Sequence, residues 1–135
     1  MTGGGSIFDV TGDEVAYTGR ATHGFELHCD TRNPNNLEIN WGGNRFHLTD
    51  LQAANCSDDP AISPNPPDAS FDTFVGIGTG RYNGEPGYCA NWTFTDAGEP
   101  GTSDTATIVI TDCAGTTILS VSGPLNNGNH QAHSQ

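Results

Sequence analysis

The residue types best suited to metal chemistry lie between Asp96 and Asp104. Asp96, Glu99 and Asp104 offer carboxylate oxygens, and Gly98 and Gly101 leave nearby backbone carbonyls accessible. Ca²⁺ takes about six to eight oxygen ligands of this kind. The segment therefore predicts a calcium site, although Asp, Pro and Gly in this order are equally typical of a well-formed hairpin loop.

A second group of polar side chains is expected on one face of a sheet. His28 and His47 alternate with apolar neighbours, and Glu26, Glu38 and Arg45 fall on the same side of their strands. Imidazole and carboxylate groups suit a transition-metal or sugar-binding patch. Polar residues are also the ordinary content of the solvated face of an antiparallel sheet. Both interpretations stay open at this point.

Three tyrosines are candidates for carbohydrate binding. Tyr17, Tyr82 and Tyr88 have amphipathic rings that would stack on sugars if they formed an exposed strip. The alternative is that the rings cover the edges of the core.

Catalytic motifs are not found in the sequence. It contains no G-x-S-x-G, H-E-x-x-H or Walker string. Gly76, Gly78 and Gly80 do not form a nucleotide site, because their spacing is wrong and no helical pattern follows. We therefore expect a protein that is not an enzyme and that requires no cofactor.

Short alternating segments must position all these residues. Phe25, Leu27 and Cys29 alternate with polar residues, which predicts a strand with one buried face. Gly42-Gly43-Asn44 separates two further alternating runs and predicts a hairpin. Its inward residues should be Leu37, Ile39, Trp41, Phe46 and Leu48.

The second half of the chain reads as a series of neighbouring strands. Gly76, Gly78 and Gly80 share one strand face, where Trp41 or Trp92 would fill the space left by missing side chains. Segments 88–95, 104–112 and 117–122 also alternate. We expect residues 1–10 to be an extended Gly-rich segment. Residues 126–135 should form a polar tail with His130 and His133 in solvent.

The four cysteines predict two disulfides. If segments 88–95 and 104–112 pair so that residue numbers sum to 202, Cys89 lies opposite Cys113. The remaining pair is then Cys29–Cys56. Four cysteines allow three connectivities, so this pairing is a choice among them. Disulfides indicate an oxidising compartment.

Composition limits the class of protein and its partners. The chain has 135 residues, 18 Gly, 8 Pro, four basic and 16 acidic residues, and a formal net charge of −12. Such a surface repels phosphate backbones, so we expect no nucleic-acid partner. No apolar run approaches the roughly 20 residues of a spanning helix, so we expect no membrane insertion. Residues 1–6 lack the basic start and apolar stretch of a signal peptide.

Several strings resemble a known domain type. They include Thr2 to Ile7, Ala21 to Phe25, Phe94 to Gly101, Asp104-Thr105 and Gly128 to Gln131. Together they resemble the β-rich accessory domains of the post-choice-of-anchor type, found near the C-termini of large secreted bacterial cell-surface proteins. The resemblance implies a β-rich extracellular module and brings no established activity.

These observations predict one all-β domain over residues 1–135, an antiparallel β-sandwich or partly closed barrel of about eight strands. We expect a secreted or cell-surface module with a structural or adhesive role. Residues 2–10 would add a strand to a neighbouring copy and build a filament. The alternative is a module that binds carbohydrate or calcium. Its partners would be copies of itself, other extracellular proteins, or carbohydrate.

Overall fold

The computed structural model describes residues 1–7, 20–58, 71–97 and 104–132. These residues form strands joined by turns, and no helix occurs among them. The strands are β1 (Thr2–Ile7), β2 (Ala21–Glu26), β3 (Asn36–Trp41), β4 (Asn44–Ser57), β5 (Thr73–Tyr82), β6 (Glu85–Thr95), β7 (Thr105–Thr111), β8 (Thr117–Pro124) and β9 (Asn127–Gln131).

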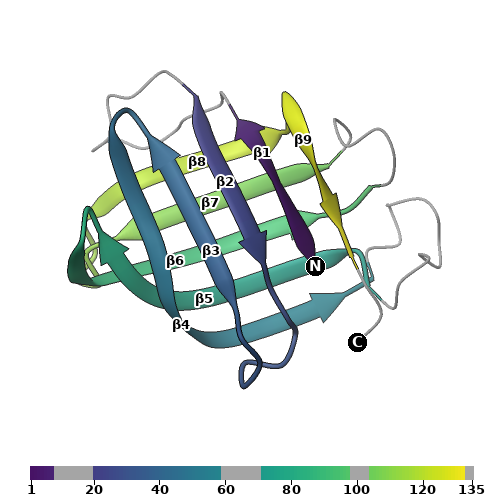
Figure 1. The fold of residues 1–135 in the computed structure, drawn as a ribbon, viewed down its shortest axis with the longest axis horizontal. Helices are drawn as coiled ribbons and strands as arrows, with labels where there is room; N and C mark the ends of the chain where they lie inside the picture. Colours follow the sequence, from purple (N-terminus) through teal and green to yellow (C-terminus); the bar gives the residue numbers. More distant parts are fainter. Residues whose placement is uncertain (8–19, 59–70, 98–103, 133–135) are drawn as a thin grey trace.

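The strands form one antiparallel sheet in the order β8-β7-β6-β5-β4-β3-β2-β1-β9. Each strand from β1 to β8 lies beside its neighbour in sequence, whereas β9 returns to the free side of β1. Figure 1 shows that the sheet curls over itself. Strands β1, β2, β3 and β9 lie across β5 to β8, and β4 passes from one layer to the other. The result is a half-barrel that encloses the core.

The bend in β4 has a local cause. Its pairing with β5 shifts register between Leu48 and Asp50 and again between Leu51 and Ala53. Such bulges insert unpaired residues and increase local bending and twist. They allow one 14-residue strand to serve both layers.

The core is built from the inward faces of both layers. It contains Trp92, Phe46, Phe71, Phe74 and Phe94 as its largest fully buried side chains. Glycines on β5 make room for Trp92, as the sequence predicted, and also for Phe46. A Cβ on Gly76 would overlap the indole of Trp92, and a Cβ on Gly80 would lie 2.7 Å from Phe46. The glycine face therefore lets two large side chains lie against the backbone.

The predicted hairpin and its inward residues are confirmed. Trp41 pairs with Asn44 across Gly42 and Gly43, which have φ of 50° and 83°. Positive φ at both central residues is the geometry that suits the twist of a two-residue hairpin. The five residues predicted to point inward from this hairpin are all buried.

Both predicted disulfides are confirmed, but the register used to predict one of them is wrong. Cys29 bonds Cys56 and Cys89 bonds Cys113. On β6 and β7, however, Cys89 pairs with Thr111 and Thr93 with Thr107, so residue numbers sum to 200. Cys113 lies beyond the end of β7 with a φ of 67°. This turn brings its Cα to 5.1 Å from that of Cys89.

The run that contains Phe46 and Leu48 belongs to β4, which continues to Ser57. One further expectation needs correction. The segment expected to be a solvated tail contains β9, and His130 is fully buried there. The sequence also predicts strands at residues 7–10 and 14–17 and an acidic, Pro-rich loop at residues 57–70. Residues 8–19 and 59–70 lie outside the described residues, as does His133.

Candidate functional site

Strand β1 occupies a slot between two other strands. Six of its positions pair with β2 and five with β9, all antiparallel. The side chains of Met1 and Ile7 at its two ends are each 1% exposed. The Met1 amino group also donates to the Leu27 carbonyl at 2.7 Å. Backbone pairing along the strand and an apolar anchor at each end hold β1 in this slot.

The slot accepts only a strand that is nearly free of side chains in its middle. A Cβ on Gly4 would lie 2.5 Å from the His23 carbonyl oxygen, and Cβ atoms on Gly3 and Gly5 would overlap the carbonyls of Asn129 and Asn127. Gly3 also has a φ of 149°. The Thr2-Gly-Gly-Gly-Ser6 sequence is therefore matched to this position in the sheet.

Two buried histidines face each other beneath β1. His23 lies on β2 and His130 on β9, with their Nε2 atoms 2.7 Å apart. His130 Nδ1 lies 2.9 Å from the Thr95 carbonyl oxygen, which can only accept, so Nδ1 carries the proton. In a neutral ring His130 Nε2 then accepts from His23 Nε2. This leaves His23 Nδ1 buried with no hydrogen-bond partner among the described residues.

Burial keeps this histidine pair neutral. It lowers the pKa of His23 to about 3, with the neighbouring His130 as a lesser cause. Burial also lowers the pKa of His130 to about 4, against the opposing effects of the Thr95 hydrogen bond and Asp96. Phe25 and Phe94 stack on the His23 ring and contact the His130 ring edge-on or tilted, with centroids 5.1 to 5.9 Å apart. The pair belongs to the packed core.

The residues predicted to bind calcium serve the backbone where they are described. The Asp104 carboxylate is fully buried and accepts from the amides of Ala97 at 2.6 Å and His130 at 2.7 Å. Asp96 accepts from the amide of Ala132 at 2.9 Å. Glu99 lies outside the described residues, and the rest contain no group of three or more His, Cys, Asp or Glu that could hold a metal ion.

Calcium binding at Asp96, Glu99 and Asp104 therefore stays a prediction. A melting temperature that rises on adding calcium and falls again in EDTA would confirm it. An unchanged melt would contradict it, and would leave Asp104 as the acceptor that joins the end of β6 to β9.

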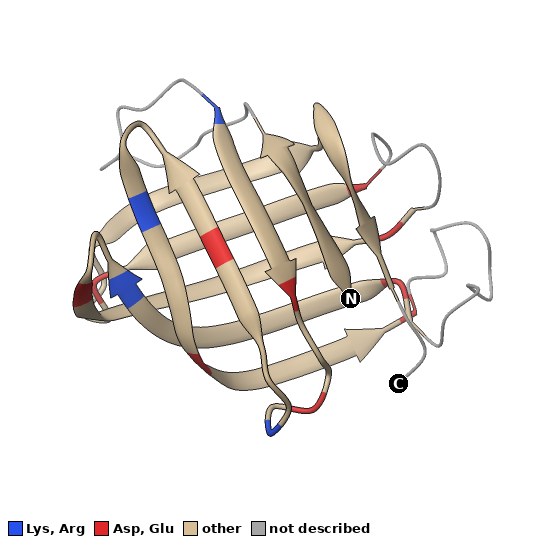
Figure 2. Ribbon diagram, viewed as in Figure 1, with Lys and Arg blue, Asp and Glu red and all other residues tan. Residues whose placement is uncertain are grey.

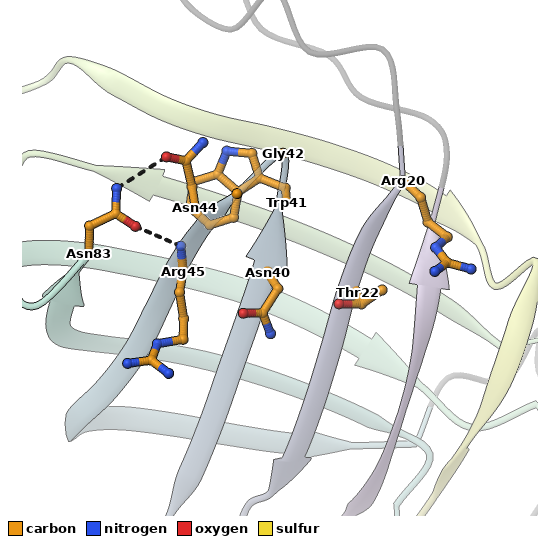
Figure 3. Close-up of a pocket in the computed structure, with 9 residues that line it drawn as sticks. Arg20, Thr22, Asn40, Trp41, Gly42, Asn44, Arg45 and Asn83 are labelled. Atoms are coloured by element: carbon orange, nitrogen blue, oxygen red, sulfur yellow. Dashed lines mark hydrogen bonds between the residues drawn. The ribbon is translucent and has the colours of Figure 1, made fainter.

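A shallow polar depression lies on the outer face of the sheet, over β2, β3 and β4. It has a volume of about 790 Å³ and is bordered by Arg20, Thr22, Asn40, Arg45 and Asn83. Figure 3 shows Thr22 and Asn40 between the two arginines. Thr22 pairs with Asn40, and Asn40 pairs with Arg45, so these side chains form one row across β2, β3 and β4.

Hydrogen bonds fix one end of this row. Asn83 accepts from the Arg45 amide at 2.8 Å and donates from Nδ2 to Asn44 at 3.1 Å (Figure 3). The Tyr82 hydroxyl lies 3.3 Å from the same Asn44 oxygen. The other end of the row leads into a second depression of about 360 Å³, which shares Arg20 and Thr22 with the first and reaches Gly4 and Asn127.

The charge of the depression differs from that of the molecule. Two of the four basic residues line it, and none of the described lining residues is Asp or Glu. Figure 2 shows the acidic residues gathered mainly where strands meet loops. One nearby carboxylate, Glu38, lies 3.7 Å from the Arg45 guanidinium.

The surface residues predicted from the sequence come together only in part. His28 is half-buried, bonded to the Pro34 carbonyl and 4.0 Å from Glu26, whereas His47 is exposed on β4. Tyr82 and Tyr88 pack edge to face at 5.1 Å and are half-buried, which favours the core-edge alternative. Tyr17 lies outside the described residues.

Neither the histidine pair nor the whole polar row was predicted from the sequence. His23 occupies an inward position in the alternating run Ala21, His23 and Phe25, and that periodicity was the available signal for its burial. The row depends on the register of β2, β3 and β4, which only the fold supplies.

Comparisons with family models, curated proteins and solved structures find no match to this chain. In the described part of the chain, nothing is both helical and long and apolar enough to cross a membrane. The two disulfides indicate an oxidising environment outside the cytoplasm.

Proposed function

We propose that this protein is a non-catalytic, secreted structural module of a bacterial cell surface or matrix that assembles by exchanging β1 between copies. In the assembled form β1 of one copy fills the slot between β2 and β9 of the next. The observation that carries the proposal is the position of β1 as an inserted strand, with a partner on each side and an apolar anchor at each end.

Exchange of this kind changes few contacts. A β1 from a second copy would make the same backbone pairs and bury the same Met1 and Ile7 side chains. Exchange of an identical element is a low-cost route to assembly. The thirteen residues between Ile7 and Ala21 could span roughly 40 Å when extended, enough to reach an adjacent molecule.

The remaining features agree with an extracellular support role. Two disulfides stabilise the sheet. One joins Cys29, just after β2, to β4, and the other joins β6 to the turn after β7. A net charge of −12 keeps the surface soluble outside the cell. Adhesion to other extracellular proteins is part of the same proposal.

The proposal is tested by replacing residues 8–20 with a single proline. Ile7 and Ala21 are paired neighbours, so one residue cannot close the hairpin, because hairpin loops need about two residues or more. We expect this variant to fold only as oligomers in sedimentation velocity experiments, with each β1 placed in another copy.

The matched control replaces residues 8–20 with thirteen glycine and serine residues, which keeps the hairpin possible. A proline variant that stays monomeric and folded would contradict strand exchange. So would one that fails to fold at every concentration while the control folds. As a second control, Gly4→Val is added to the proline variant. It should remove the oligomers of that variant, because the valine side chain collides with the His23 carbonyl oxygen.

A further inference from the structure

We infer that the outer face of β5, β6, β7 and β8 is a self-association surface, on which a second copy of this chain packs face to face. The surface is separate from the β1 slot, because β1 belongs to the other layer of the sheet (Figure 1). Association through it requires no exchange of β1 and goes beyond the function proposed above.

The surface carries no charge. Charged residues make up 15% of the sequence, but none occurs at positions 51–57, 73–79 or 89–95, nor anywhere in β7 or β8. Figure 2 shows the charged residues of this layer at the ends of its strands. In a chain with a net charge of −12, this is an area where two copies can meet without bringing like charges into contact.

Aliphatic side chains lie in the middle of this surface. Val75 and Ile77 are 37% and 49% exposed, and they are the large apolar side chains that are exposed in the described part of the chain. They pair with Thr93 and Asn91 of β6, and Asn91 pairs in turn with Val109 of β7. β-Branched side chains of this kind pack well between two sheets.

The hydroxyl groups around them already have partners within the surface. The hydroxyls of Thr95 and Thr105 lie 2.7 Å apart, and those of Thr107 and Ser122 lie 2.9 Å apart. Burying a hydroxyl is costly mainly when it loses its hydrogen bond. A second sheet could therefore cover these residues and leave their hydrogen bonds intact.

A second copy suits this surface better than a charged or a carbohydrate partner. A charged partner would find no complementary charge here. Stacking on sugars requires exposed aromatic rings, whereas Phe74, Trp92 and Phe94 on these strands are buried. The same face of a second copy is uncharged and rich in β-branched residues, and a two-fold axis would place it opposite itself.

The net charge opposes association, but it acts from the edges of the surface. Glu85, Asp96 and Asp104 lie at the ends of β6 and β7 rather than in the middle of the face (Figure 2). Charges are screened over about 8 Å at physiological ionic strength and over about 3 Å in 1 M salt. Association should therefore strengthen as salt is raised, whereas an interface made of ion pairs would weaken.

The size of the surface sets the strength of the contact. Four strands about 4.8 Å apart, each with about seven residues of roughly 3.3 Å, cover about 400 Å². A standard stable interface buries about 800 Å² on each partner. Two free copies should therefore associate weakly, and copies that are linked to one another should associate much more tightly.

Sedimentation equilibrium of the folded monomer tests this surface. The monomer is isolated by size exclusion without unfolding, so that β1 stays in its own copy, and is measured up to about 1 mM protein. We expect a dimer that dissociates on dilution. It should form severalfold more readily in about 1 M salt than at physiological ionic strength.

Methyl nuclear magnetic resonance on the same samples locates the contact. The methyl signals of Val75, Ile77 and Val109 should shift as the protein concentration rises, because these side chains become covered. The signals of Ile39 and Val121 should stay in place, because both residues are already buried in the core.

Two variants that add the same charge separate this surface from the rest of the molecule. Asn91→Asp places a carboxylate in the middle of the surface, and we expect it to weaken the dimer at least about tenfold, because like charges then face each other. Asn40→Asp is the matched control at an exposed position of β3. It should change the dissociation constant by less than about twofold, because its charge lies outside the contact.

Several results would contradict the surface. They are monomers alone up to about 1 mM in both salt conditions, a dimer that high salt dissociates, methyl shifts confined to other residues, or equal effects of Asn91→Asp and Asn40→Asp. A dimer that persists on dilution would also contradict it, since that behaviour is expected of exchanged β1. None of these results removes strand exchange, which unfolding and refolding test separately.

Discussion

At the scale of single residues, the buried histidine pair makes stability depend on pH. The folded pKa values of His23 and His130, about 3 and about 4, lie below the ordinary value of 6.5. Between these values the unfolded chain binds more protons than the folded one. The stability that the protein has when both histidines are neutral is therefore fully present above pH 6.5. It is lost as the pH falls toward the folded pKa values.

We expect the free energy of unfolding to fall by on the order of 2 kcal/mol per histidine between pH 7 and pH 5. Urea titrations at both pH values measure this change. His23→Phe removes one titrating group and should roughly halve the loss. Equal losses in the variant and the unmodified protein would show that other groups cause it.

The glycines of β5 make a second prediction at this scale. Gly76→Ala should destabilise the protein by about 1–3 kcal/mol, because the added methyl group overlaps the buried Trp92 indole. Gly24→Ala on β2 is the matched control. Its Cβ would meet nothing within 4 Å, so its midpoint in urea should change little. A Gly76→Ala variant as stable as this control would contradict the packing described.

Residue types alone predicted the inward faces well but failed at His130. Alternation identifies a buried face wherever the alternating residues are apolar, as for Leu37, Ile39 and Trp41. The segment around His130 contains only Gly, Asn, His and Gln, so nothing in its composition indicates burial. Its place follows from pairing with β1, a contact more than 120 residues away in sequence.

At the scale of elements, the Cys89–Cys113 bond joins β6 to the turn that follows β7. It closes a loop of 24 residues, which corresponds to about 3 kcal/mol in the chain-entropy model. We expect the double variant Cys89→Ser, Cys113→Ser to lose about this free energy of unfolding, measured in urea. A loss below about 0.5 kcal/mol would show that β6 and β7 hold their pairing without it.

The cysteine pairing could be predicted although the register could not. Cys89 and Cys113 lie within reach in either register, because the turn at Asp112 brings the chain back toward β6. That turn is held by the Asp112 carboxylate, which accepts from the amides of Ala114 and Thr116. Similarly, the two bulges in β4 break the alternation after Leu48, which concealed the rest of the strand.

At the scale of the whole molecule, the outer strands of the sheet differ in how they are secured. β8 is held to β7 along its length, and the Leu125 amide just after β8 donates to the Asp104 carbonyl just before β7. Among the described strands β9 pairs with β1 alone, and β1 is the strand that we propose to be exchanged between copies. Exchange of β1 therefore links the sheets of two molecules through β2 and β9.

The most direct test of the account is the mass distribution of the unmodified protein after unfolding and refolding at high concentration. Native mass spectrometry should show a ladder of oligomers beyond the dimer, and the same preparation refolded at high dilution should show monomers. Monomers alone at every concentration, with both disulfides intact, would contradict assembly through β1.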